Sequence, residues 1–464
     1  MNRRLGTGWL GLAALFCGLF AVFAFADSQV RIVRISDVQG SVQIDRATGQ
    51  GYEKAFINMP VSQGVKLKTA ADARAEVEFE DGTVIHLTPG TVVEFTDLAL
   101  RDSGGKVSTV DLQQGEAYFN FSGKKYDEFT VTFGREKVPL TQPAHFRVNL
   151  KDTSASLAVF KGDVQVAGPS GEVAVGKKQT ATFDFADNGQ YALDKSIEED
   201  PFDTWDKQQT DYHERYLVRN SNNYPYAYGL SDLGYYGSFF NLAGYGSCWQ
   251  PYFTGFGWDP FMDGAWMYTP GYGYTWVSAY PWGWMPYHYG SWMYAGGGTG
   301  WCWLPGNTWM TYYVPRITKP PRGYVPPHPP VVGGGGHVVA IGRGPTSPKL
   351  PPKYTPLSTL TVQRGDAGLS IPRGIHNLKG INRDFVDRGQ VTLQMSQPRS
   401  ALGAVPTTPR VTVAPSHPSA PSHVSTGGGG SYGGGRVSTP TSTPASTPAP
   451  APAPSSHPSS TPHK

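Results

Sequence analysis

One segment of the chain reads Ala73-Arg74-Ala75-Glu76-Val77-Glu78-Phe79-Glu80-Asp81-Gly82-Thr83-Val84-Ile85-His86-Leu87. Up to Phe79, small or apolar residues alternate with charged ones, which is the period of two expected of a β-strand with one buried face. Asp81 and Gly82 follow as a turn pair that tolerates a positive φ, and a second apolar run resumes after them. The segment therefore predicts a β-hairpin.

Similar short strands are predicted on both sides of this hairpin. They lie at residues 41–44, 92–95, 117–121, 129–133, 146–150, 156–160, 163–166 and 179–183, separated by Gly and Asp turns. No helical period interrupts them, and a region of about 165 residues can bury a sizeable core. The fold class is therefore expected to be mainly β, with residues 27–195 forming a sandwich or roll.

Several motifs in this region are similar to those of the FecR-type periplasmic domain. They are a Gly-x-Val strand within 38–44, a Gly-x-x-x-x-Thr step at 64–69, a strand, Asp-Gly-Thr and second strand at 75–91, and the segments 115–119 and 160–166. The resemblance implies a β-rich extracytoplasmic domain for sensing or interaction. Family members that signal to a sigma factor have a cytoplasmic segment before a transmembrane helix. Only a few residues precede the apolar run here, so direct sigma-factor regulation is not expected.

Residues 196–220 predict a helical connector. Five residues share one stripe at three- and four-residue spacing: Phe202, Trp205, Gln209, Tyr212 and Tyr216. This spacing is typical of an amphipathic helix. Asp200 can cap the helix, and Pro201 suits its first position. We expect the stripe to dock on a neighbouring domain, and binding of a separate partner remains the alternative.

Residues 221–313 make up an aromatic module. Ten of the twelve tryptophans of the chain lie between Trp249 and Trp309. The segments 257–268 and 283–294 repeat Gly, Trp, Pro, an aromatic residue, Gly, Trp, Met and Tyr in register, and a third Trp-x-Pro-Tyr stands at 249–252. Copied units of this kind pack against one another. We therefore expect a small aromatic-rich β repeat module.

The string from Trp282 to Trp292, Trp-Gly-Trp-Met-Pro-Tyr-His-Tyr-Gly-Ser-Trp, carries a second resemblance. It is similar to the Trp/Tyr/Gly-rich domain of unknown function that follows FecR domains in many bacterial chains. The spacing also resembles choline-binding cell-wall repeats, but the prolines and the longer period argue against that relation.

Two interpretations of these aromatic rings stay open. In one, they fill the core of a domain that has few aliphatic residues. In the other, they form a row of flat faces that stack on sugar rings or cationic groups of an envelope polysaccharide, peptidoglycan or an envelope protein. The candidate ligand-binding residues are Trp258, Trp266, Trp284, Tyr287, His288 and Trp292. Residues 220–313 contain no Lys or Arg, so the basic groove needed for single-stranded nucleic acid is missing.

Two cysteines, Cys248 and Cys302, lie inside the aromatic module. An isolated pair in an oxidising compartment predicts a disulfide. Each cysteine has a tryptophan neighbour, so buried free thiols are the alternative.

Residues 1–26 are expected to be a signal peptide. Arg3 and Arg4 precede an apolar run at 10–25, and Ala24-Phe25-Ala26 resembles a cleavage site. The protein is therefore expected in the periplasm, at the cell surface or outside the cell. Contact with a membrane is expected only if this segment stays uncleaved.

Residues 314–464 are rich in Pro, Gly, Ser and Thr, and are expected to be a disordered tail. The islands 359–362 and 391–395 are candidates for short docked strands. Residues 316–464 contain fifteen Lys or Arg and three acids, whereas residues 27–313 contain twenty-two and thirty-three. A basic tail beside an acidic body leaves three interpretations open: an anionic partner, a tail folded back on its own body, or a solvated tail.

The sequence contains no pattern typical of a catalytic or metal site. The histidines are scattered, and His-x-x-x-His, Cys-x-x-Cys and Gly-x-Ser-x-Gly do not occur. We therefore expect no enzymatic activity, no metal and no cofactor. The expected function is that of a secreted, envelope-associated binding or scaffold protein. The alternative is a membrane-anchored envelope-sensing component.

Overall fold

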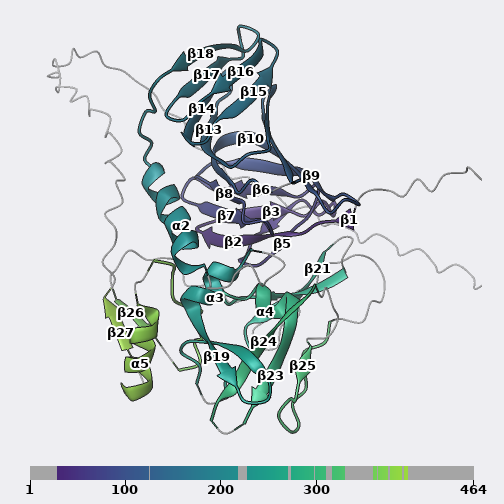
Figure 1. The fold of residues 1–464 in the computed structure, drawn as a ribbon, viewed down its shortest axis with the longest axis vertical. Coiled ribbons are helices and arrows are strands. Elements are labelled where there is room, and N and C mark those ends of the chain that lie inside the picture. The colour runs from purple at the N-terminus through teal and green to yellow at the C-terminus, as the bar shows by residue number, and fades with distance from the viewer. Residues whose placement is uncertain are drawn as a thin grey trace, which may run out of the picture. The chain divides into compact units, whose positions relative to one another are not determined.

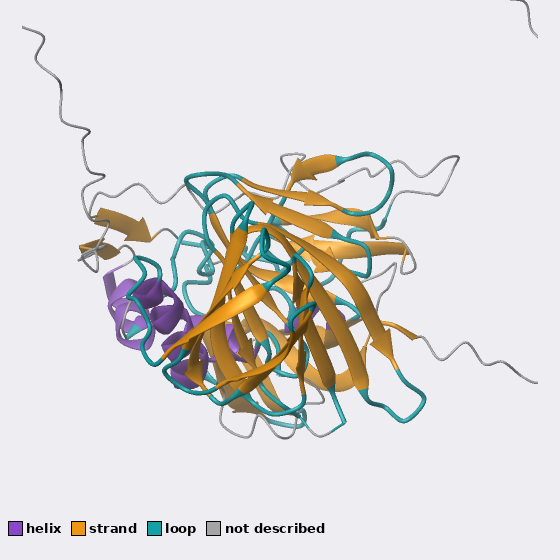
Figure 2. Cartoon of the chain, turned by 90° about the horizontal axis from the view of Figure 1, so that it is seen from above, coloured by secondary structure: helices purple, strands orange, loops and turns teal. Residues whose placement is uncertain are grey.

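The structure, a computed structural model, describes residues 29–124, 126–217, 227–255, 257–269, 273–296, 298–309, 316–329, 359–362, 364–374, 377–388 and 391–394. The chain divides into two units, residues 1–405 and 406–464, and all described residues belong to the first. The predicted signal peptide and much of the predicted tail lie outside the described residues. The described chain is mainly β, with far more strand than helix, as expected (Figure 2).

The strands between Gln29 and Asp194 form two sheets (Figure 1). The first contains β1 (Gln29–Val30), β3 (Val42–Asp45), β4 (Tyr52–Lys54), β6 (Lys66–Thr69), β9 (Val92–Leu100), β11 (Glu128–Phe133), β12 (Glu136–Leu140), β15 (Val164–Gly168) and β16 (Gly171–Val175). The second contains β2 (Val33–Gln39), β5 (Pro60–Val61), β7 (Arg74–Glu78), β8 (Val84–Leu87), β13 (Ala144–Leu150), β14 (Ser154–Lys161), β17 (Thr180–Asp184) and β18 (Gln190–Asp194).

The long strand β10 (Lys106–Phe121) belongs to both sheets. Its first half pairs with β9 and β11, and its second half pairs with β8 and β13. Apolar side chains of both sheets enclose a common core. Each strand expected from the sequence overlaps a strand of the structure, and β9 and β10 extend beyond their predicted bounds.

The predicted hairpin at 73–87 is confirmed as β7 and β8. Ala75 pairs with Leu87 and Val77 with Ile85, and all four side chains lie in the core. Gly82, at φ +91°, occupies the left-handed region that the turn requires. The alternate residues of the two strands face the other side of the second sheet.

Helix α2 (Asp203–Tyr216) follows the two sheets, within the predicted connector. Trp205, Gln209 and Tyr212 are buried, so the predicted stripe docks on the protein itself. The carboxylate of Asp200 accepts a hydrogen bond of 2.7 Å from the backbone N–H of Phe202, just before the helix.

The aromatic module and the tail residues just after it contain two short helices and seven strands within the described ranges. They are α3 (Leu230–Tyr236), β19 (Gly237–Leu242), β20 (Gly246–Pro251), β21 (Gly264–Thr269), β22 (Gly273–Ser278), α4 (Met285–His288), β23 (Tyr289–Ala295), β24 (Gly300–Trp309) and β25 (Ile317–Thr318). One sheet has the order β19-β20-β24-β23-β25, and β21 and β22 form a separate hairpin.

Three hairpins share one contact, in which Gly264 and Gly290, equivalent positions of the sequence repeat, take part. In each hairpin, a glycine at or near the start of the first strand lies against the indole of a tryptophan on the second. The three pairs are Gly237 with Trp249, Gly264 with Trp276, and Gly290 with Trp303. A Cβ placed on Gly264 would lie 2.6 Å from Cζ2 of Trp276, so only glycine leaves room for this ring.

Part of the predicted disordered tail is folded. Besides β25 and the residues up to 329, the structure describes β26 (Thr359–Val362), α5 (Leu378–Arg388) and β27 (Val391–Gln394). The two islands form strands, as predicted, and these strands, β26 and β27, pair with each other. Val362, Ile371, Leu378 and Phe385 are buried in the same apolar cluster as the tryptophans.

Candidate functional site

The six residues expected to form a ligand-binding face belong to the interior. Trp258, Trp266, Trp284, Trp292 and His288 are each at most 5% exposed. Tyr287 is partly buried, and its hydroxyl donates to the carbonyl of Pro260. The expected row of exposed rings is therefore wrong at these positions. The physical reason is that this module has few aliphatic side chains, so the indoles supply its buried apolar area.

Cys248 and Cys302 form a disulfide, with their Cα atoms 6.0 Å apart. They lie on the neighbouring strands β20 and β24, next to the paired residues Trp249 and Trp303. In the chain-entropy model, closing a loop of this length contributes about 4 kcal/mol.

Charged side chains cover the outer face of the second sheet. The strand registers place Glu76 opposite His86, His86 opposite Tyr118, and Tyr118 opposite Arg147. These four side chains therefore form one row across β7, β8, β10 and β13. A row of this kind normally faces water, but here all four residues are buried.

Helix α2 covers this row with two acidic residues. His86 Nδ1 lies 2.7 Å from the carboxylate of Asp206, and His86 Nε2 lies 3.1 Å from Glu76. Asp203 accepts hydrogen bonds of 2.8 Å from the hydroxyl of Tyr118 and 2.6 Å from Arg147. The helix is thus held by ionic contacts as well as by its aromatic stripe.

Arg34 on β2 links the sheet to the aromatic module. Its guanidinium donates to Glu78, 2.8 Å away, and to the carboxylate of Asp232 on α3. Asn58, which also accepts from Arg34, donates to the carbonyls of Ser278 and Tyr280 at 2.9 and 2.8 Å. Contacts from both strands and turns therefore join the two regions.

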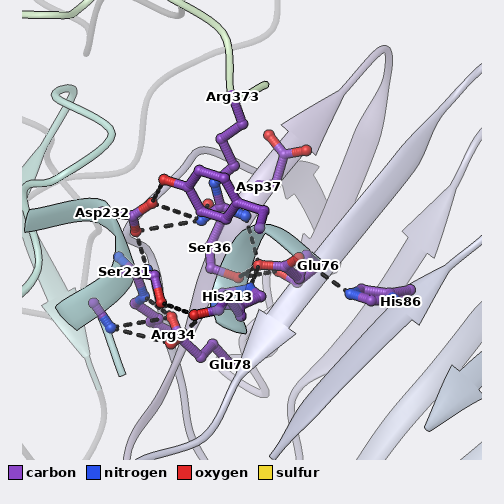
Figure 3. A network of polar contacts seen from close by, with 12 residues as sticks. Arg34, Ser36, Asp37, Glu76, Glu78, His86, His213, Ser231, Asp232 and Arg373 are labelled. Carbon is purple, nitrogen blue, oxygen red and sulfur yellow. Dashed lines mark hydrogen bonds and ion pairs between the residues drawn. The ribbon is translucent and has the colours of Figure 1, made fainter. Parts of the chain in front are cut away.

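Arg373, from the tail, completes the cluster (Figure 3). It donates to Glu76 at 2.6 Å, to Asp232 at 3.0 Å and to the carbonyl of Ser36 at 3.0 Å. Its guanidinium also lies 4.7 Å from the ring centre of Tyr212. We call Arg34, Glu76, Glu78, His86, Asp206, Tyr212, His213, Asp232 and Arg373 the junction cluster.

Ionisation in the junction cluster follows from these contacts. Burial acts to lower the pKa of Arg373, but the charges of Asp232 and Glu76 raise it well above its ordinary value. Burial acts to raise the pKa of Glu76, whereas Arg373 and His213 bring it well below the usual range. Burial likewise opposes the charge of His86, but hydrogen bonds to Asp206 and Glu76 raise its pKa to about 9. The cluster is therefore a set of mutually neutralised charges.

The junction cluster connects four segments of the chain and holds its ionisable groups against one another. Within the described ranges, no group of three or more His, Cys, Asp or Glu side chains is arranged to hold a metal ion. None of the helices described is both long enough and apolar enough to span a bilayer. The contacts of the junction cluster hold these four segments together.

Sequence reasoning did not identify the junction cluster. Glu76 and Glu78 alternate with apolar residues, so the sequence predicts that their side chains face solvent. The elements that cover them are distant in sequence, so the local pattern gives no sign of their burial. His86 and Asp206 are 120 residues apart, and Glu76 and Arg373 are 297 apart. The one available signal was the opposite charge of the body and the tail.

The chain matches two family models. Residues 65–165 match the family described as "FecR protein", which includes Glu76, Glu78 and His86. Residues 230–329 match the "Family of unknown function (DUF6600)", which includes Asp232. Arg373 and α5 lie outside both matches. No curated protein matches the chain.

Two crystal structures of a "putative anti-sigma factor" from Parabacteroides distasonis ATCC 8503 are similar to part of the chain. One is 23% identical over 28% of this chain and 59% of that chain, with a TM-score of 0.25. The other is 21% identical over 34% of this chain and 69% of that chain, with the same TM-score of 0.25. The family matches, together with the fold, identify a chain in which a FecR-type domain is followed by a DUF6600 domain.

Proposed function

We propose that this protein is a non-enzymatic binding or scaffold protein of the bacterial cell envelope, in which the FecR-type and DUF6600 domains work as one rigid body. The observation that carries the proposal is the ion pair between Arg34 and Asp232. Both side chains are 0% exposed, and they lie 198 residues apart: Arg34 on β2 of the β region that contains the FecR match, and Asp232 within the DUF6600 match.

A buried ion pair of this kind resists separation of its partners. Removing one member of a buried pair costs about 3–5 kcal/mol, because the other charge stays in the interior without compensation. Separation of the two domains would expose Arg34, Asp232 and Asn58 together. A body that stays closed presents a fixed surface, which favours a role in positioning other envelope components.

The partner we propose is another envelope component, a polymer or a protein, bound on the outside of this body. The buried indoles are not the contact surface. The FecR-type match supports an extracytoplasmic location, since members of that family are associated with the envelope.

The second candidate function is envelope sensing by a membrane-anchored protein, which the FecR-type match favours. The two candidates differ at the N-terminus. N-terminal sequencing of protein from fractionated cells separates them: a mature chain that starts at Asp27 supports the released scaffold, and a retained apolar segment supports the anchored sensor.

The rigid-body proposal is tested by calorimetry of the full chain and of Asp232→Asn. We expect a single unfolding transition in both, with the variant less stable by about 3–5 kcal/mol. The control is Asp211→Asn, since that carboxylate is 44% exposed and, among the described residues, pairs with Lys207 on the same helix; its loss should change stability by under about 0.5 kcal/mol. Two separate transitions, of which only one responds to Asp232→Asn, would disprove the proposal.

A further inference from the structure

The described residues 364–374 and 377–388 lie against the body as a bound peptide would. Ala367, Ile371, Leu378 and Phe385 are buried among the rings of the aromatic cluster. The ring centre of Phe385 is 5.5 Å from that of Phe253. This segment follows both family matches in the chain and belongs to neither.

Side chains of the body bind the backbone of this segment. The indole N–H of Trp282 donates to the carbonyl of Ala367 at 2.7 Å. The hydroxyls of Tyr236 and Tyr235 donate to the carbonyls of Ile371 and Pro372 at 2.8 and 3.2 Å. These three contacts fix the path of a segment that contains turns.

The backbone of Phe253, in the body, also forms hydrogen bonds with this segment. Its carbonyl accepts from the N–H groups of Gly365 and Ala367 at 3.2 and 3.3 Å, and its own N–H donates to Asn382 at 2.8 Å. Gly368 passes so close to Tyr236 that an added Cβ would lie 2.9 Å from the ring. The body therefore recognises both the backbone and the small size of residues at defined positions.

Arg373 anchors the part of the segment before α5. Its guanidinium is 7% exposed and reaches two carboxylates, those of Glu76 and Asp232, one from each domain. Arg34, the other arginine of the cluster, pairs with Glu78 and Asp232. The charge of Glu76 is instead balanced by Arg373, His86 and His213. A planar guanidinium with several donors fits two carboxylates and a carbonyl, which an ammonium group does not.

We propose that the junction of the FecR-type and DUF6600 domains is a peptide-binding site, whose ligand is a turn-containing apolar segment that carries an arginine. Its occupant is the described residues 364–374 and 377–388 of the same chain, with Leu369-Ser370-Ile371-Pro372-Arg373 as the recognised core. A ligand in the same chain has an effective concentration on the order of millimolar, which favours this occupant over a second copy. The proposal goes beyond the rigid-body function, because that function needs only the contact between the domains.

The first test uses the full chain with a specific protease site in place of Gly333–Gly336, cut after folding. After cutting, the C-terminal fragment should coelute with the body in gel filtration. The fragment of Arg373→Gln should separate from the body. The matched control is Arg383→Gln, which removes the same charge from an exposed position of α5 and should leave the fragment bound.

The second test keeps the body unchanged, so that misfolding of a variant cannot mimic the result. A labelled peptide of residues 364–388 is added to the cut wild-type protein, and binding is followed by fluorescence anisotropy. We expect the wild-type peptide to replace the native fragment, the peptide with Arg373→Gln to bind at least about 100-fold more weakly, and Arg373→Lys to lie between them.

Two results would overturn the proposal. One is separation of the wild-type fragment from the body on cutting, and the other is equal affinity of the wild-type and Arg373→Gln peptides. In either case a body that still unfolds in one transition leaves the proposed rigid-body function standing. Concentration-dependent dimers of the uncut chain would show that the segment binds in trans, against the proposal of a same-chain occupant.

Discussion

At the scale of single residues, the ionisation of His86 and Glu116 makes the stability of the protein depend on pH. His86 faces Glu76 from β7, Asp206 from α2 and Tyr118 from β10, and its pKa rises from 6.5 to about 9. Burial raises the pKa of Glu116 from 4.5 to about 7, and the nearby charge of Asp200 adds to the effect. Both groups hold a proton more tightly in the folded than in the unfolded chain.

The consequence is a protein that loses stability as the pH rises. Glu116 contributes its full stabilisation below pH 4.5, and this is lost by about pH 7. His86 contributes its full stabilisation below pH 6.5, and this is lost by about pH 9. Each contribution to the free energy of unfolding amounts to about 3 kcal/mol at most. Asp206, with its pKa lowered to about 2, contributes above pH 3.8 and loses this contribution as the pH falls. We expect maximal stability between about pH 4 and 5.

Urea unfolding between pH 4 and 10 measures this dependence. Glu116→Gln should flatten the curve between pH 4.5 and 7 and leave the slope above pH 7 in place. His86→Gln should flatten the upper part and lower the stability at every pH. Unchanged slopes in both variants would show that these two residues do not determine the pH dependence.

At the scale of elements, the hairpins of the aromatic module depend on a glycine that lies under an indole. Gly264→Ala would place a methyl group 2.6 Å from the Trp276 ring, so the ring or the strand must move. Overpacking of this kind costs about 1–3 kcal/mol. Thermal unfolding and the near-ultraviolet circular dichroism of the indoles measure the loss and the displacement.

The control for this prediction is Gly296→Ala, because a Cβ at that exposed position has no atom within 4 Å. Its stability should equal that of the wild type or exceed it slightly. Equal stabilities of the two variants would mean that the indole adapts without cost, and that the glycine–tryptophan contact does not explain the sequence repeat.

The sequence predicted elements far better than it predicted contacts between them. Period two located β7 and β8, and the three- and four-residue spacing located α2, since both patterns depend on neighbours in the chain. The same alternation marked Glu76 as a surface residue, because nothing local announces that Asp206 and Arg373 will cover it. Burial of the tryptophans was one of two open interpretations for a related reason: composition gives the number of rings but not their orientation.

At the scale of the whole molecule, one apolar cluster brings together residues from four parts of the chain, beside the separate core of the two sheets. It contains Ile32 from the FecR-type region, Tyr212 from α2, Trp282 from the DUF6600 domain and Phe385 from the tail. A disturbance in one of these regions is therefore transmitted to the others through packed side chains.

Removal of the disulfide tests this continuity. Cys248→Ala with Cys302→Ala should lower the free energy of unfolding by about 4 kcal/mol, with a single transition retained. Urea unfolding followed by tryptophan fluorescence measures the change, and wild-type protein unfolded with a reductant present should approach the same value. A new transition confined to the indoles would show that the DUF6600 domain unfolds alone.

The contacts of Arg373 also have a consequence for synthesis. A ribosome makes Asp232 first and reaches Arg373 only 141 residues later, which takes roughly 7–28 s at ordinary elongation rates. During that interval Glu76 and Asp232 lack their contacts with Arg373, and Tyr236 and Phe253 lack their contacts with Ile371 and Phe385. The nascent chain consequently exposes apolar and acidic surface until Arg373 has emerged. A chaperone that delays compaction would therefore serve it better than rapid folding.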